Sequence, residues 1–234
     1  MSTDCRAEPS QAPNVRSGTV ELIIGPAATS ITVHEGVLRL RSHFFDAALN
    51  KCWKEGSLGK VVLPEEQPDT ITTYIQYLYS GKIYIEETKT RDGLSESDNL
   101  PEYPILAELY VFGERVQDTT FKNSVMDAMA ARVCEPSVDD ETDNSFPVTS
   151  AVDIVYKGTV AGSKARQFMV DMHVLWGCGK WITPRSEDHN KDFLMDLARE
   201  MLDLRVRDRE NNAIITTSLG EVDFSKYREK TESK

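Results

Sequence analysis

Paired cysteines, excess basic charge and long hydrophobic runs are all missing from this sequence. No run approaches the roughly 18 apolar residues that a membrane span needs, so we expect no such span. The 234 residues carry 27 Lys and Arg against 38 Asp and Glu, a formal net charge of -11. Clustered Lys and Arg provide affinity for nucleic acids and for anionic membranes, so we expect neither as a partner.

The four cysteines lie far apart, without the CxxC or Cys/His spacing of a zinc site. They are Cys5, Cys52, Cys134 and Cys178. Scattered cysteines indicate free thiols in a reducing compartment, so we expect an intracellular protein of the cytoplasm or nucleus. The first residues contain no apolar stretch, and we therefore predict no signal peptide.

Little in the sequence points to catalysis. No two of the four histidines (His34, His43, His173 and His189) are spaced i, i+4 as an HExxH zinc site requires. Gly158–Lys164 comes nearest to a phosphate-binding loop, but it is one residue short and a serine separates its second Gly from the Lys. We interpret it as an interhelical loop and predict no cofactor, no metal and no enzyme. A small nucleotide-binding enzyme stays a remote alternative.

What the sequence does contain is one rich apolar stretch, residues 33–53, which reads VHEGVLRLRSHFFDAALNKCW. Its apolar period changes from 2 to about 3.6, which predicts the end of a strand followed by two short helices. Ser42 is a good N-cap for the second helix, predicted over Phe44–Asn50. The two aromatics at the start of that helix, together with Trp53, are too much apolar area to leave in water. We therefore predict that this stretch forms the centre of a core.

Strands are predicted on both sides of this stretch. Val20–Ile24 and Ile31–Val33 flank a Gly-Pro break and should form a hairpin. Lys60–Leu63 is predicted as a third strand, and Lys82–Glu86 as a brief edge strand. Between the last two lies a helix with Pro at its first position and Gly81 as its left-handed C-cap.

The remainder is predicted to be mainly helical, with apolar residues at helical spacing near 105–116, 121–132, 148–155, 168–176 and 194–204. Residues 135–143 carry five acids and no base, which indicates a solvated linker. The predicted organisation is a disordered leader at 1–17, a domain at 18–134 with a flexible insertion at 87–102, an acidic linker at 135–147, a helical C-terminal extension at 148–206 and a mostly disordered tail at 207–234.

Over residues 18 to about 134, this pattern resembles the BTB/POZ fold. The residues that carry the resemblance, and that we expect in the family's core motif, are His34, Val37, Leu38, Ser42, Phe44, Phe45, Trp53, Tyr74, Leu78 and Gly81. The Trp-Lys-Glu that begins at Trp53 is similar to short fungal BTB-domain proteins. The resemblance implies an α+β fold in which helices cap a small sheet, followed here by an α-helical appendage.

The resemblance also implies a protein-interaction module. BTB domains commonly dimerise, and many present substrates to a cullin-RING ubiquitin ligase, so a second copy and a cullin are the expected candidate partners. As candidate interface residues we name Val20, Leu22, Leu40, Tyr77 and Tyr79. An adaptor or scaffold for ubiquitin ligation is the preferred function, and a transcription-related BTB scaffold without its own DNA-binding domain is the alternative. Thr19 and Glu35 depart from the charged residues of the DNA-directed members, which disfavours that branch.

Overall fold

The computed structural model describes residues 12–50, 58–85, 102–134, 146–147, 149–182, 189–211 and 222–231. The chain divides into two compact units. The N-terminal unit contains residues 1–84 and 115–118, and the C-terminal unit contains residues 85–114 and 119–234. We predicted one domain over 18–134, whereas this division places residues 102–114 and 119–134 with the helices that follow them.

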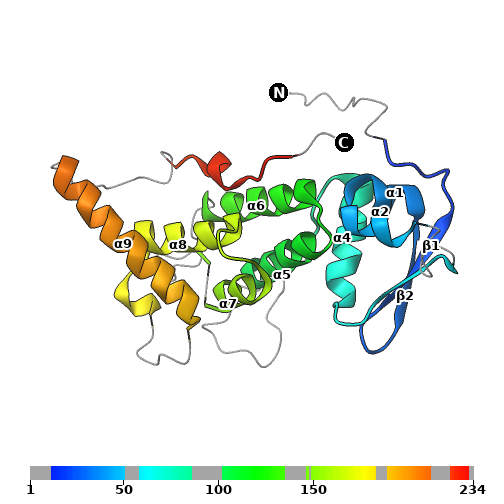
Figure 1. Ribbon diagram of the computed structural model, residues 1–234, viewed down its shortest axis with the longest axis horizontal. Coiled ribbons are helices and arrows are strands. Elements are labelled where there is room, and N and C mark those ends of the chain that lie inside the picture. Colours follow the sequence, from blue (N-terminus) through cyan, green and yellow to red (C-terminus); the bar gives the residue numbers. More distant parts are fainter. Residues whose placement is uncertain are drawn as a thin grey trace. The chain divides into compact units, whose positions relative to one another are not determined.

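A three-stranded sheet forms one side of the N-terminal unit (Figure 1). Its strands are β1 (Thr19–Ile24), β2 (Thr29–His34) and β3 (Lys60–Leu63), in the order β2-β1-β3. β1 pairs antiparallel with β2 and parallel with β3, which confirms the predicted hairpin and third strand. Side chains alternate along β1, so that one face packs inward through Val20, Leu22 and Ile24.

Helices α1 (Glu35–Arg41), α2 (His43–Ala48) and α4 (Pro68–Ser80) complete this unit. Ser42 caps α2 as predicted, because its side chain accepts a hydrogen bond from the backbone N–H of Phe45 at 3.0 Å. Pro68 opens α4, and Gly81 closes it in the left-handed conformation with φ of 70°. Both ends of α4 therefore follow the sequence signals.

The core of the N-terminal unit lies between the sheet and these helices. Phe45 and Tyr74 are fully buried, and their rings stack with centroids 6.5 Å apart. The Tyr74 hydroxyl donates to Asp118 at 3.0 Å, so the short segment 115–118 is fastened to α4. Other fully buried members are Leu22, Ile24, Leu38 and Ile71.

The C-terminal unit is helical (Figure 1). Its elements are α5 (Glu102–Arg115), α6 (Thr119–Cys134), α7 (Thr149–Gly158), α8 (Lys164–Trp176), η3 (Gly179–Trp181), α9 (Lys191–Asn211) and η6 (Phe224–Tyr227). The predicted helices are present, although α5 begins three residues before Ile105. α7 approaches α5 so closely that a Cβ added at Gly158 would lie 2.4 Å from a methyl group of Val111. This packing requires glycine at the end of α7.

Two predicted elements differ from the structure. Residues 82–85 are not in a strand, so the predicted edge strand at Lys82–Glu86 is wrong over its described part. The tail predicted at 207–234 is ordered where the structure describes it, because α9 continues to Asn211 and Tyr227 is only 1% exposed. A buried tyrosine holds residues 222–231 against the helices, an interaction that local composition does not reveal.

Several predictions concern residues that lie outside the described part of the chain. They are Trp53, most of the leader, the insertion except for Glu102, residues 135–145 of the acidic linker, and residues 212–221 and 232–234 of the tail. Among the residues that are described, no helix is both long enough and apolar enough to cross a membrane.

Candidate interaction surface

A buried serine organises the junction between α1 and α2. Ser42 is fully buried and donates its hydroxyl hydrogen bond to the carbonyl of Val116, while it also caps α2. The backbone N–H of Phe44 points to the same carbonyl at 3.4 Å. These contacts fix the start of α2, and with it the direction in which the side chains of that helix point.

The adjacent aromatics of α2 have different environments. Phe45 is fully buried, whereas 38% of Phe44 is exposed, and their rings meet edge to face at 5.1 Å. Successive residues of a helix point about 100° apart, and in α2 this difference places Phe45 in the core and Phe44 at its edge. We had placed both in the core motif; the structure leaves Phe44 available on the surface.

Leu40, on the preceding helix, is also 41% exposed. The two helices are tied beside it by Arg39, which forms ion pairs of 2.9 Å with Glu35 and with Asp46. The hydrogen bonds that Arg39 donates to Glu35 and Asp46 raise the pKa of its guanidinium. The exposed side chains of Leu40 and Phe44 thus lie on two helices that Arg39 links through its ion pairs.

The end of α4 contacts the end of β2 through Tyr79. Its hydroxyl accepts a hydrogen bond from the backbone N–H of His34 at 3.2 Å and lies 2.7 Å from Nδ1 of the same residue. Tyr79 remains 39% exposed, whereas Tyr77 is only 5% exposed. Of these two tyrosines, Tyr79 is therefore the one whose ring an approaching protein can reach.

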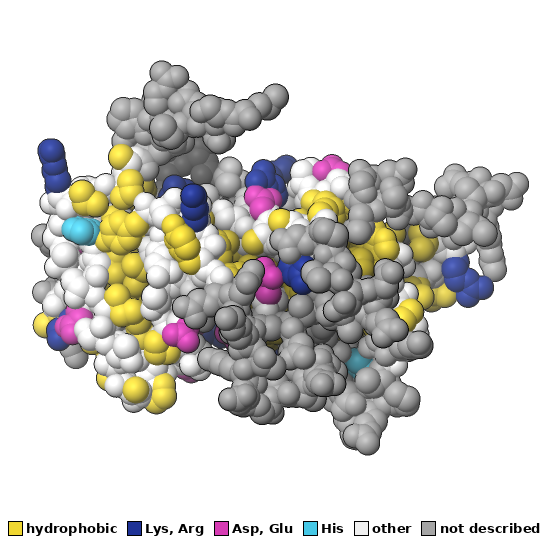
Figure 2. Space-filling model, turned by 180° about the vertical axis from the view of Figure 1, so that it is seen from behind, with side chains coloured by type: hydrophobic (Ala, Val, Ile, Leu, Met, Phe, Trp, Pro, Cys, Tyr) yellow, Lys and Arg dark blue, Asp and Glu magenta, His cyan; other side chains and the backbone are white. Residues whose placement is uncertain are grey.

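The remaining candidate interface residues, Val20 and Leu22, also differ from Tyr79 in exposure. Val20 and Leu22 are 2% and 0% exposed, so in this chain their side chains belong to the core of the N-terminal unit. Val62, which we did not name, is 59% exposed on β3. Strand alternation could have identified it, because only one of two adjacent valines in a strand can face the core. Figure 2 shows hydrophobic side chains gathered in a band over this unit, at the left of that view.

The other motif residues also have definite positions. Val37, Leu38, Tyr74 and Leu78 are buried, His34 is half-buried and Gly81 is exposed at the helix end. Their distribution is that of a core formed by sheet, α1, α2 and α4. Among the residues that the structure describes, Leu40, Phe44 and Tyr79 combine a place in or beside the motif with an exposed ring or aliphatic group.

Residues 18–110 match the family model of the BTB/POZ domain. The BTB/POZ match covers the sheet, α1, α2, α4 and α5 as far as Tyr110. No curated protein matches the chain. The fold is therefore the predicted one, a BTB/POZ domain with a small three-stranded sheet, followed by further helices. The BTB/POZ domain identifies a protein-interaction module.

The loop at Gly158–Lys164 has no phosphate-loop architecture. It joins two helices, α7 and α8, whereas a phosphate-binding loop follows a strand. Lys164 instead bonds to Gln167 on its own helix at 3.2 Å. Within the described ranges, no three His, Cys, Asp or Glu side chains gather in an arrangement that could hold a metal ion.

Proposed function

We propose that this chain is a non-catalytic adaptor that brings bound proteins to a cullin-RING ubiquitin ligase. The observation that carries the proposal is the BTB/POZ match, since many members of that family act in this way. The exposed Phe44 supports it, because aromatic side chains are enriched at protein interfaces. The acidic net charge of -11 favours partners with a basic or mixed face.

Binding to purified cullins tests this function directly. The full chain should capture at least one cullin at micromolar concentration, and Phe44→Glu should weaken that capture if α2 lies in the interface. Val62→Glu is a matched control, because Val62 is also an exposed apolar residue, at 59% against 38% for Phe44, but lies on β3. A folded chain that binds no cullin would reject the ligase role and leave a scaffold without ligase function as the better description.

We also propose that the chain forms a homodimer through α1 and α2. Two-fold pairing is the commonest form of homo-oligomer, and Leu40 and Phe44 supply an exposed apolar surface for it. Sedimentation velocity over about 1–100 μM covers the range in which weak dimers dissociate. Replacing Leu40 by Lys should shift the chain toward monomer, while Val62→Lys should not. A monomer at every concentration would reject self-association.

A further inference from the structure

Residues 222–231 lie along α6 and α8 in the C-terminal unit (Figure 1). The surface that receives them, which we call the tail groove, is lined by Tyr110, Lys122, Asn123, Asp127, Phe168 and Asp171. These residues come from α5, α6 and α8, whereas the segment that they hold is up to 119 positions away in sequence. The groove is therefore a tertiary feature of the helices, occupied by a separate short piece of chain.

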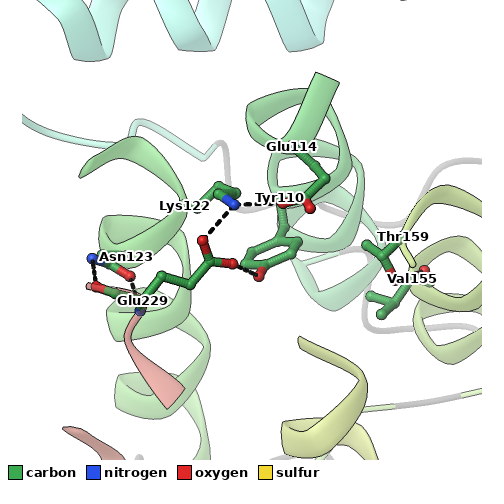
Figure 3. Close-up of polar contacts among 7 residues, drawn as sticks. All are labelled: Tyr110, Glu114, Lys122, Asn123, Val155, Thr159 and Glu229. Atoms are coloured by element: carbon green, nitrogen blue, oxygen red, sulfur yellow. Dashed lines mark hydrogen bonds and ion pairs between the residues drawn. The ribbon is translucent and has the colours of Figure 1, made fainter. Parts of the chain in front are cut away.

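The backbone of that piece is held by one side chain. Asn123 accepts a hydrogen bond from the backbone N–H of Glu229 at 2.7 Å and donates one to its carbonyl at 2.9 Å (Figure 3). The amide of Asn can satisfy a donor and an acceptor of an extended backbone at once. These two bonds do not depend on which side chain the held residue carries, so any extended segment could make them.

Selectivity for an acidic residue comes from the charges beside this clamp. The Glu229 carboxylate pairs with Lys122 at 2.6 Å and accepts a hydrogen bond from Tyr110 at 2.9 Å (Figure 3). Burial alone would lower the pKa of Lys122, but its hydrogen bonds to Glu114 and Glu229 outweigh that effect and the pKa is raised. Lys122 therefore stays charged, and an acid in this position shares its buried ammonium group with Glu114.

A second subsite takes an aromatic ring. Tyr227 is 1% exposed and meets Phe168 edge to face at 5.1 Å. Its hydroxyl donates to Asp171 at 2.8 Å, and Lys226 pairs with the same carboxylate at 2.7 Å. Burial, followed by the charge of Asp171, raises the pKa of Tyr227, so the subsite accepts the neutral phenol. It combines an apolar wall with one acceptor, which suits tyrosine, because a phenylalanine there would lose the hydrogen bond to Asp171 and leave that carboxylate with Lys226 alone.

The rim of the groove adds selectivity with little affinity. Arg228 pairs with Asp127 through two nitrogens, but both side chains are about half exposed. Exposed ion pairs of this kind contribute about 0–1 kcal/mol. One buried anchor (Tyr227), one half-buried anchor (Glu229) and a backbone clamp thus hold the segment, a distribution that is characteristic of short-peptide recognition.

We propose that the tail groove is a peptide-recognition site whose resident occupant, residues 222–231, is displaced by a partner segment of the same chemistry. That chemistry is a basic residue, a tyrosine, a second basic residue and an acid in consecutive order, as in Lys226–Glu229. The proposal concerns the C-terminal unit and is independent of cullin binding. An occupant on the same chain competes at an effective concentration of about millimolar. The groove therefore binds a partner only when residues 222–231 have dissociated from it.

A labelled peptide of residues 222–231 tests this by fluorescence anisotropy with the full chain. Wild-type chain should bind the peptide about tenfold or more weakly than the Tyr227→Ala chain, because only the latter has lost its resident anchor. Tyr84→Ala is the matched control, since Tyr84 is exposed and belongs to the N-terminal unit; it should behave as wild type. Adding Asn123→Ala to Tyr227→Ala should abolish binding, and a scrambled peptide should not bind at all.

Three results would overturn the proposal. One is a folded Tyr227→Ala chain that does not bind the peptide, and another is equal binding by wild type and Tyr227→Ala. The third is loss of the fold in Tyr227→Ala, which would make the segment an integral part of the unit. Hydrogen exchange of the wild-type chain gives an independent measurement. The Glu229 amide, bonded to Asn123, should exchange well before the amides of α8. Exchange together with α8 would mean that residues 222–231 dissociate only when the helices unfold.

Discussion

The adjacent phenylalanines of α2 allow a stability test in which chemistry and sequence position are matched. Phe45→Ala removes a fully buried ring that stacks on Tyr74, and should reduce the unfolding free energy of the N-terminal unit by about 3–5 kcal/mol. Phe44→Ala removes a ring that is 38% exposed and makes one edge-to-face contact, a loss of about 1 kcal/mol. The two variants should therefore differ by at least about 2 kcal/mol.

Urea denaturation of the full chain, followed by far-UV circular dichroism, measures this difference. A chain of two units unfolds in two transitions when the units unfold independently, so the comparison uses the transition that Phe45→Ala shifts. The dependence of the unfolding free energy on urea concentration is fitted separately for each variant. Equal losses at the two positions would refute the argument that α2 turns only one ring inward. A loss below about 0.5 kcal/mol at Phe45 would place that ring outside the core.

Three further predictions concern single polar groups. Ser42→Ala removes a cap and a buried partner and should cost about 1–3 kcal/mol in urea denaturation, whereas Ser80→Ala, on an exposed helix end, should cost about 0.5 kcal/mol or less. Tyr74→Phe leaves Asp118 without one buried donor and should cost about 1–3 kcal/mol in the same assay. Burial lowers the pKa of His173 below its ordinary value of 6.5, so the unfolded state binds the proton first and stability should fall as the pH drops below about 6.5. Thermal unfolding between about pH 5 and 8 should show this fall in wild type and a weaker one in His173→Gln.

Local signals account for most of what the sequence predicted correctly. The caps at Ser42 and Gly81 and the first-turn Pro68 act within one helical turn, so a single sequence contains them in full. The hairpin of β1 and β2 could also be predicted from the sequence, because alternating residues on both sides of a tight turn have few other arrangements.

The features that escaped prediction depend on distant partners. The segment around Tyr227 has few apolar residues and so was predicted to be disordered, yet Phe168 and Asp171 bury its ring from positions more than 50 residues away. Phe44 is a smaller case of the same kind. Its hydrophobicity favoured the core, but the direction of α2, set by the Ser42 contact with Val116, decided which ring entered it.

The Ser42–Val116 and Tyr74–Asp118 bonds have a consequence for synthesis of the chain. Segment 115–118 belongs to the N-terminal unit although the helices on both sides of it belong to the other unit. Domains fold during translation once all of their parts have emerged from the ribosome. The first 110 residues, which contain the whole family match, would emerge before Val116 and Asp118, which accept hydrogen bonds from the hydroxyls of Ser42 and Tyr74. The N-terminal unit therefore completes its fold only after residue 118 has emerged, when α5 is already outside the ribosome.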